Sequence, residues 1–136
     1  RIFLGDVGSI PLGFLAGTIG LLGWRQRLWP VWFPIVVFSP FIVDASVTLV
    51  RRFFLGERVW QAHRSHYYQR LVRIGWGHKK TALAEYALML AAAGSAVWGM
   101  EQLFPAQMML LGIWVIIYIV LAVAVDHSWR VNETQT

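Results

Sequence analysis

A series of long apolar blocks, separated by polar or basic residues, constrains this chain more than any other feature. The blocks are roughly 17 to 25 residues long, the length that a helix needs to cross about 30 Å of hydrocarbon. Four blocks predict four transmembrane helices, at residues 7–24, 32–50, 82–104 and 108–125. We therefore expect an all-α, polytopic membrane protein.

The composition agrees with a lipid environment. Of the 136 residues, 57% are hydrophobic and 14% are charged, so the chain carries more apolar surface than a soluble domain of this size buries. Cysteine is absent, which excludes a disulfide framework and a thiolate metal site. The chain begins at Arg1 without a signal-peptide pattern, and we expect residues 1–136 to be the C-terminal part of one integral membrane domain.

Positive charge is concentrated between the second and third blocks. Eight of the twelve Lys and Arg residues lie in the segment 51–80. The positive-inside rule places this loop in the cytoplasm, and alternation of the spans then places Arg25, Arg27 and Glu101 outside. Because the basic residues are not spread over a soluble face, we expect no nucleic-acid partner. Within the loop, residues 60–73 lack Gly and Pro and predict a short helix.

Two blocks contain small residues at four-residue spacing, which lets helices approach closely in lipid. These residues are Gly13 and Gly17 in the first block, and Ala87, Ala91, Ser95 and Gly99 in the third. We expect them to pack within the chain, with a homodimer as the alternative. Pro40 falls inside the second block and is expected to kink or break that helix.

The segment Gly-Asp-Val-Gly-Ser at residues 5–9 precedes the first block. Gly5 and Gly8 permit unusual backbone angles, and Ser9 can cap a helix. Helix N-terminal N–H groups attract phosphate, and a carboxylate such as Asp6 is a hard oxygen ligand for Mg²⁺. The alternative is an ordinary helix cap with an exposed aspartate.

Two further groups carry charge near the same membrane face. Asp44 lies inside the second block, where an unpaired carboxylate costs a few kcal/mol, so it has either a structural partner, Arg51 or Arg52, or a catalytic role. In the loop, one helical face gathers basic side chains that suit a nucleotide diphosphate or a lipid phosphate. These side chains are His63, His66, Arg70 and Arg73. Attraction to anionic lipid, a topology signal and, least favoured, a zinc site are the alternatives.

Together, the sequence RIFLGDVGS, the segment SPFIVD before two arginines and the histidine loop resemble the glycosyltransferase family 4 polyprenyl-phosphate sugar-1-phosphate transferases. The resemblance extends over residues 1–80. It implies transfer of a sugar-1-phosphate from a UDP-activated N-acetylated amino sugar to undecaprenyl phosphate, with Mg²⁺, at the cytoplasmic face of a bacterial inner membrane. The product would initiate a lipid-linked surface glycan, such as an O-antigen, or cell wall synthesis.

The resemblance also implies roles for single residues. Asp6 is the expected metal ligand and a catalytic residue, together with His66 and His63. We expect substrate binding by Gly5, Gly8, Ser9, Arg64, Arg70 and Asp44. His66 matches the family's His-x-His-His cluster, whereas Tyr68 and Gln69 replace its other two histidines.

The family's acidic pair belongs to loops upstream of these residues, so these 136 residues alone are not expected to be active. A non-enzymatic flippase or transporter part with a lipid-binding loop, in which Asp44 lies on the transport pathway, is the main alternative. A small assembly subunit is a third. Asp126 and His127, beyond the fourth block, have no assigned chemistry.

Overall fold

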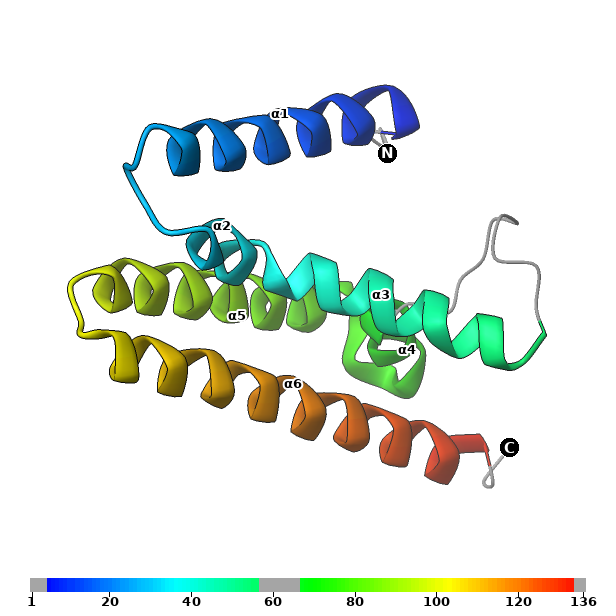
Figure 1. Cartoon of the computed structure of the whole chain (residues 1–136). Helices are drawn as coiled ribbons and strands as arrows, with labels where there is room; N and C mark the ends of the chain where they lie inside the picture. Colours follow the sequence, from blue (N-terminus) through cyan, green and yellow to red (C-terminus); the bar gives the residue numbers. More distant parts are fainter. Residues whose placement is uncertain (1–4, 57–66, 134–136) are drawn as a thin grey trace.

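The computed structural model describes residues 5–56 and 67–133, which fold into helices joined by turns, with no strand among them (Figure 1). The elements are α1 (Gly5–Arg25), α2 (Trp32–Val37), α3 (Ser39–Phe54), α4 (Tyr67–Leu71), the π-helical turn η1 (Val72–Trp76), α5 (Gly77–Met100) and α6 (Phe104–Glu133). The predicted all-α class is confirmed. The short helix expected in the loop is present as α4, while residues 60–66 lie outside the described residues.

Helices α5 and α6 form a long antiparallel hairpin (Figure 1). Among the described residues, two stretches are long and apolar enough to cross a membrane, Gln69–Met100 and Phe104–Val131. The first stretch includes a turn at Gly75, whose φ of +107° favours glycine, but the 24 residues of α5 alone still extend about 36 Å. Only 17% and 11% of their apolar windows are buried, unlike the core helix of a soluble protein. The chain is an all-α membrane protein.

The second apolar block is divided into two helices. The chain leaves helical geometry at Phe38, with φ −94° and ψ 3°, and Pro40 then lies in the first turn of α3, where its missing N–H is tolerated. The Ser39 hydroxyl donates to the Val36 carbonyl at 2.6 Å across the break. The predicted break near Pro40 is therefore confirmed.

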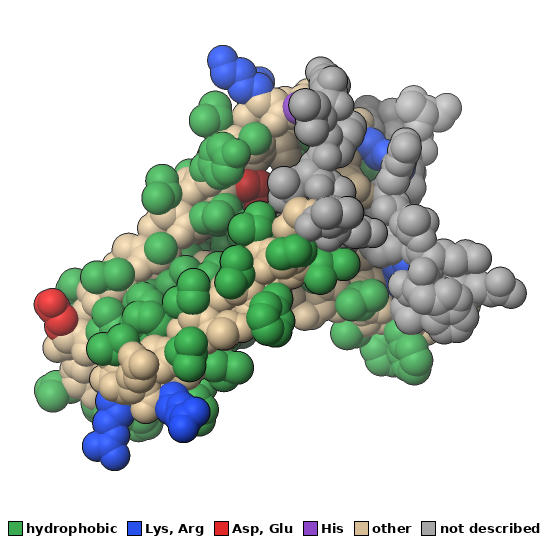
Figure 2. Space-filling model, turned by 90° about the horizontal axis from the view of Figure 1, so that it is seen from above, with side chains coloured by type: hydrophobic (Ala, Val, Ile, Leu, Met, Phe, Trp, Pro, Cys, Tyr) green, Lys and Arg blue, Asp and Glu red, His purple; other side chains and the backbone are tan. Residues whose placement is uncertain are grey.

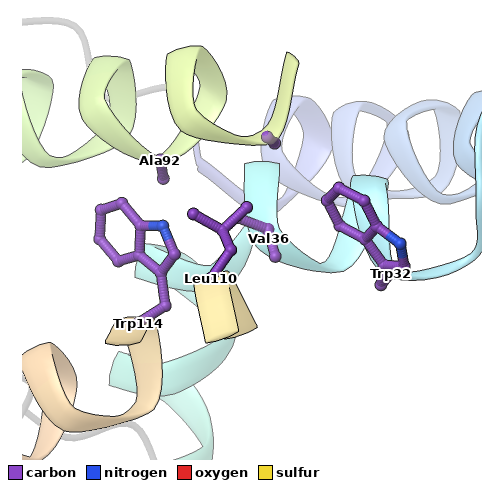
Figure 3. Packing of buried hydrophobic residues seen from close by; sticks show 6 residues of the cluster. Trp32, Val36, Ala92, Leu110 and Trp114 are labelled. Carbon is purple, nitrogen blue, oxygen red and sulfur yellow. The ribbon is translucent and has the colours of Figure 1, made fainter. Parts of the chain in front are cut away.

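The buried core lies between α2, α5 and α6, where side chains from the three helices point toward one another (Figure 3). Its members are Trp32, Val36, Ala92, Ala96, Leu110 and Trp114. Both indole groups have polar partners. Trp114 Nε1 donates to Ser95 Oγ at 2.8 Å, and Trp32 Nε1 donates to Gln107 Oε1 at 3.2 Å. Large aromatic side chains thereby fill the core without leaving a buried donor unsatisfied.

The small-residue face of α5 differs from the predicted one. Ala92, Ala96 and Gly99 are buried, whereas Ala87 and Ala91 are exposed. Residues spaced strictly by four move gradually around a helix that has 3.6 residues per turn. The buried residues are spaced by four and then by three, which keeps them on one side of the helix. The prediction that Ala87 and Ala91 belong to the packed face is wrong, and only its later part, Ser95 and Gly99, lies against α6.

Helix α1 contacts the rest of the molecule near its C-terminal end. A Cβ at Gly20 would lie 3.0 Å from Pro34 Cβ, and Trp29 Nε1 donates to the Gly20 carbonyl at 3.1 Å. At Gly13 and Gly17 an added Cβ would meet nothing within 4 Å. The expected packing of these two glycines within the chain is absent among the described residues. Figure 2 shows hydrophobic side chains across one face, with basic side chains toward its ends.

Candidate functional site

The carboxylate of Asp126 on α6 gathers groups from two other helices. Arg51 Nη1 on α3 lies 2.9 Å from Asp126 Oδ1, and Arg70 Nη1 on α4 lies 2.7 Å from the same oxygen. The Tyr67 hydroxyl donates to Asp126 Oδ2 at 3.5 Å. Three elements that are distant in sequence are thus joined through one acidic side chain.

Arg70 is the most enclosed of these groups, with 8% of its surface exposed. Its guanidinium carbon lies 5.5 Å from the centre of the Tyr67 ring and 5.6 Å from that of Trp129, so two aromatic faces flank the charge. Burial raises the pKa of Tyr67 above its ordinary value, and the negative charge of Asp126 adds to this increase. Tyr67 therefore stays a neutral phenol that can donate a hydrogen bond.

Asp44 lies beside this cluster. Its Oδ1 accepts a hydrogen bond from the backbone N–H of Tyr67 at 2.8 Å and a longer one from the Thr48 hydroxyl at 3.4 Å. Arg51, one of the two partners considered for Asp44, instead forms its ion pair with Asp126. Asp44 on α3 and Arg70 on α4, both expected to bind substrate, are thus brought close together through Tyr67.

A cavity of about 280 Å³ opens next to Asp44, between α3, α4, η1, α5 and α6. Its walls are mostly apolar, and its polar side chains include Asp44, Glu85, Tyr67 and Tyr118. The Tyr118 hydroxyl is hydrogen-bonded to Ser39 Oγ at 2.5 Å. The volume is near the lower limit for small-molecule sites, and the mostly apolar walls suit an apolar group better than a diphosphate.

The segment 5–9 forms the first turns of α1, and Ser9 is exposed there. Figure 1 shows this end of α1 at the same end of the molecule as α4 and the C-terminus. The backbone of Asp6 therefore lies in a helical first turn, where N–H groups lack intrahelical acceptors and favour an anion. His63, Arg64 and His66 lie outside the described residues.

The predicted Mg²⁺ site can be compared with the positions of the His, Asp and Glu side chains. Among the described residues, no group of three His, Asp or Glu side chains is gathered around one point. Mg²⁺ is commonly held by one or two carboxylates together with water and substrate phosphates, so it does not need such a group. The role of Asp6 as a magnesium ligand stays a prediction.

The chain is 28% identical, over 99 residues, to a protein of Bacillus subtilis (strain 168) named "Probable undecaprenyl-phosphate N-acetylglucosaminyl 1-phosphate transferase". This similarity supports the polyprenyl-phosphate sugar-1-phosphate transferase family. The aligned part is 71% of this chain and 28% of the relative, so the chain corresponds to a minor part of that protein's length. No protein-family profile matches the chain, and no solved structure matches it.

The sequence analysis missed Asp126 as the centre of an ion cluster. Its two arginine partners are 75 and 56 residues away in the chain, so no local pattern connects them. The signal in the sequence was the position of this acidic residue, directly after a long apolar block. A charge at the end of a membrane span needs a partner. Glu85, which lines the cavity, was also not singled out.

Proposed function

We propose that this chain is part of an enzyme that transfers a sugar-1-phosphate from a UDP-activated N-acetylated amino sugar to undecaprenyl phosphate. In this reaction an oxygen of the lipid phosphate forms a bond to the phosphorus that carries the sugar. The bond between the two phosphates of the donor breaks, and UMP leaves. The product is a diphosphate-linked lipid that initiates a surface glycan or cell wall precursor.

The similarity to the Bacillus transferase over 99 residues carries this proposal. The arrangement of the described residues supports it, because the first turn of α1 lies at the same end of the molecule as the arginine-rich region around α4. We propose that this end faces the cytoplasm of a bacterial inner membrane, where nucleotide sugars are available. The excess of Lys and Arg in the segment 51–80 agrees with that orientation.

In the proposed reaction, the protein mainly positions the substrates and stabilises the negative charge on the donor diphosphate. Asp6 would hold Mg²⁺, which supplies neutralisation of charge on the donor diphosphate. His66, His63 and Arg64 would bind the nucleotide sugar or move a proton. Arg70 would add positive potential, while its guanidinium is anchored by Asp126.

The central experiment is Asp6→Asn in the full-length protein, in membranes, with UMP release measured in the presence of Mg²⁺. We expect a loss of about 100-fold, since the amide lacks the charge that stabilises the transferring group. Glu101→Gln, which removes an exposed carboxylate at the opposite end of the molecule, is the matched control and should retain full activity. Activity of Asp6→Asn close to that of the unmodified enzyme would remove Asp6 from the metal-binding role.

A binding measurement separates the enzyme from a flippase or transporter part. The transferase requires Mg²⁺-dependent retention of a uridine nucleotide sugar by the purified full-length protein. If the protein retained none at millimolar Mg²⁺ while remaining folded, the transferase proposal would fail and the transporter alternative would be favoured.

A further inference from the structure

Three helices of different sequence regions meet at a single carboxylate, and this arrangement points to a role for a residue outside the proposed catalytic set. We propose that Asp126 is a positioning residue that holds α4, the described end of the cytoplasmic loop, in the orientation needed for donor binding. The proposal deepens the proposed transferase function and rests on it. It concerns the placement of the loop, not the chemical step.

Helix α4 depends on contacts with α3 and α6 because a kink separates it from α5. Its five residues, Tyr67–Leu71, continue into η1, but the backbone departs from helical geometry at Gly75, so α5 alone does not fix the direction of α4. Its contacts include the backbone hydrogen bond from Tyr67 to Asp44 and the ion pair from Arg70 to Asp126. The first contact joins α4 to α3, and the second joins it to α6.

The charges at this point make the carboxylate necessary. Arg51 and Arg70 both bond to Oδ1 of Asp126, so two guanidinium groups approach one another with one negative charge between them. Without that charge the two arginines would repel each other, and Arg70, which is 8% exposed, would retain a buried charge lacking its carboxylate. The arginines would then separate, and α4 would move away from α6.

Helix α6 fixes the direction of Arg70 with a second group. Trp129 lies about one turn after Asp126 on this helix, and its ring faces the Arg70 guanidinium at 5.6 Å. A planar guanidinium held by a carboxylate and by aromatic faces has few accessible orientations. The Arg70 side chain therefore has a fixed orientation and connects α4 to α6.

The cluster is separate from the hydrophobic core of the bundle. None of its members belongs to the group of buried apolar residues around Trp32 and Trp114. Removal of the Asp126 charge is consequently expected to displace α4 while the hairpin of α5 and α6 stays folded. This separation allows positioning to be distinguished from general stability.

The first test is a kinetic comparison in the full-length enzyme, in membranes. Asp126→Asn should raise the KM for the UDP-sugar about tenfold and leave the KM for the polyprenyl phosphate within about twofold, because the proposed function assigns the donor, and not the lipid, to this loop. Asp126→Glu, which keeps the charge, should recover most of the donor affinity. Glu101→Gln removes an equal charge from the opposite end and should change neither KM.

A purely structural defect would give a different kinetic result. It would lower the maximal rate in proportion to the amount of folded protein and leave both KM values unchanged. That result, or a donor KM in Asp126→Asn equal to the parent value, would overturn the proposal.

The second test does not depend on activity. Spin labels at Arg73→Cys and Arg130→Cys, both exposed positions, report the distance between η1 and α6 in a background without other reactive cysteines. We expect a narrow distance distribution in the parent, a broad one with Asp126→Asn, and no change with Glu101→Gln. An unchanged distribution with Asp126→Asn overturns the positioning role even if the enzyme is active. Broadening in a protein that lacks transferase activity supports the positioning role and rejects the proposed function.

Discussion

Gly99 is the glycine of the hairpin that neighbouring side chains approach most closely. A Cβ built there would lie 2.6 Å from Leu110 Cδ2 on α6 and 3.2 Å from the Trp32 ring on α2. The absence of a side chain thus lets three helices meet near the turn between α5 and α6. Gly94, on the same helix, has open space around its Cβ position.

The two glycines provide a matched pair of substitutions. Gly99→Ala should destabilise the folded protein by about 1 kcal/mol, because the tip of Leu110 can rotate away but the Trp32 ring has little room. Gly94→Ala should be neutral or slightly stabilising, since alanine is the better helix former. Thermal unfolding in detergent measures both. Equal melting temperatures for the two variants would contradict the close approach at Gly99.

At the level of helices, α5 and α6 are linked by a polar contact within an apolar interface. Ser95 accepts the indole hydrogen of Trp114 at 2.8 Å and donates to the carbonyl of Ala92 at 2.9 Å. Trp114 is 7% exposed, so its N–H has little access to solvent or lipid headgroups. The hydroxyl of Ser95 therefore fixes the relative position of the two helices.

Ser95→Ala should reduce stability by about 1 to 2 kcal/mol, because the buried indole N–H would lose its acceptor. Ser128→Ala is the control: its hydroxyl is exposed and, within the part of the chain that the structure describes, bonds only the Ala124 carbonyl of its own helix, at 2.9 Å. The control should lie within about 0.5 kcal/mol of the parent. Unfolding in increasing denaturant measures the difference, and a Ser95→Ala protein as stable as the control would show that Trp114 contributes by packing alone.

The helices could be predicted from sequence more fully than the contacts between them. Apolar length and Pro40 indicated the helical class and the break before α3, since both effects are local to the backbone. The partners of Asp126 could not be predicted, because they depend on how α3, α4 and α6 pack. Four-residue spacing likewise identified α5 as a packing helix but misplaced part of its buried face. For the candidate site, the sequence supplied residue types, and only the fold brought Asp44 and Arg70 together.

For the whole molecule, the described helices alternate in direction between two ends (Figure 1). At one end, the turn between α1 and α2 adjoins the turn between α5 and α6, because Arg27 and Met100 line the same pocket. At the other end lie α4, Asp126 and the start of α1. If α1, the α2–α3 pair, α5 and α6 cross the bilayer, the two ends correspond to its two faces.

This arrangement predicts which positions share a side of the membrane. Single cysteines can replace exposed Arg27 and Glu101 at one end, and Lys79 and Arg130 toward the other. Residues 1–136 contain no cysteine, so once any cysteine elsewhere in the full-length protein is replaced, each introduced thiol is compared with a cysteine-free parent. An impermeant maleimide should label positions 27 and 101 in intact cells and positions 79 and 130 only after lysis, since the positive-inside rule predicts that the basic loop is retained in the cytoplasm. Labelling of 27 and 101 from different sides would contradict the helix arrangement itself. Labelling of positions 79 and 130 in intact cells, with 27 and 101 protected, would agree with the helix arrangement. It would contradict the proposed transferase, because the candidate site would then face away from the nucleotide sugars of the cytoplasm.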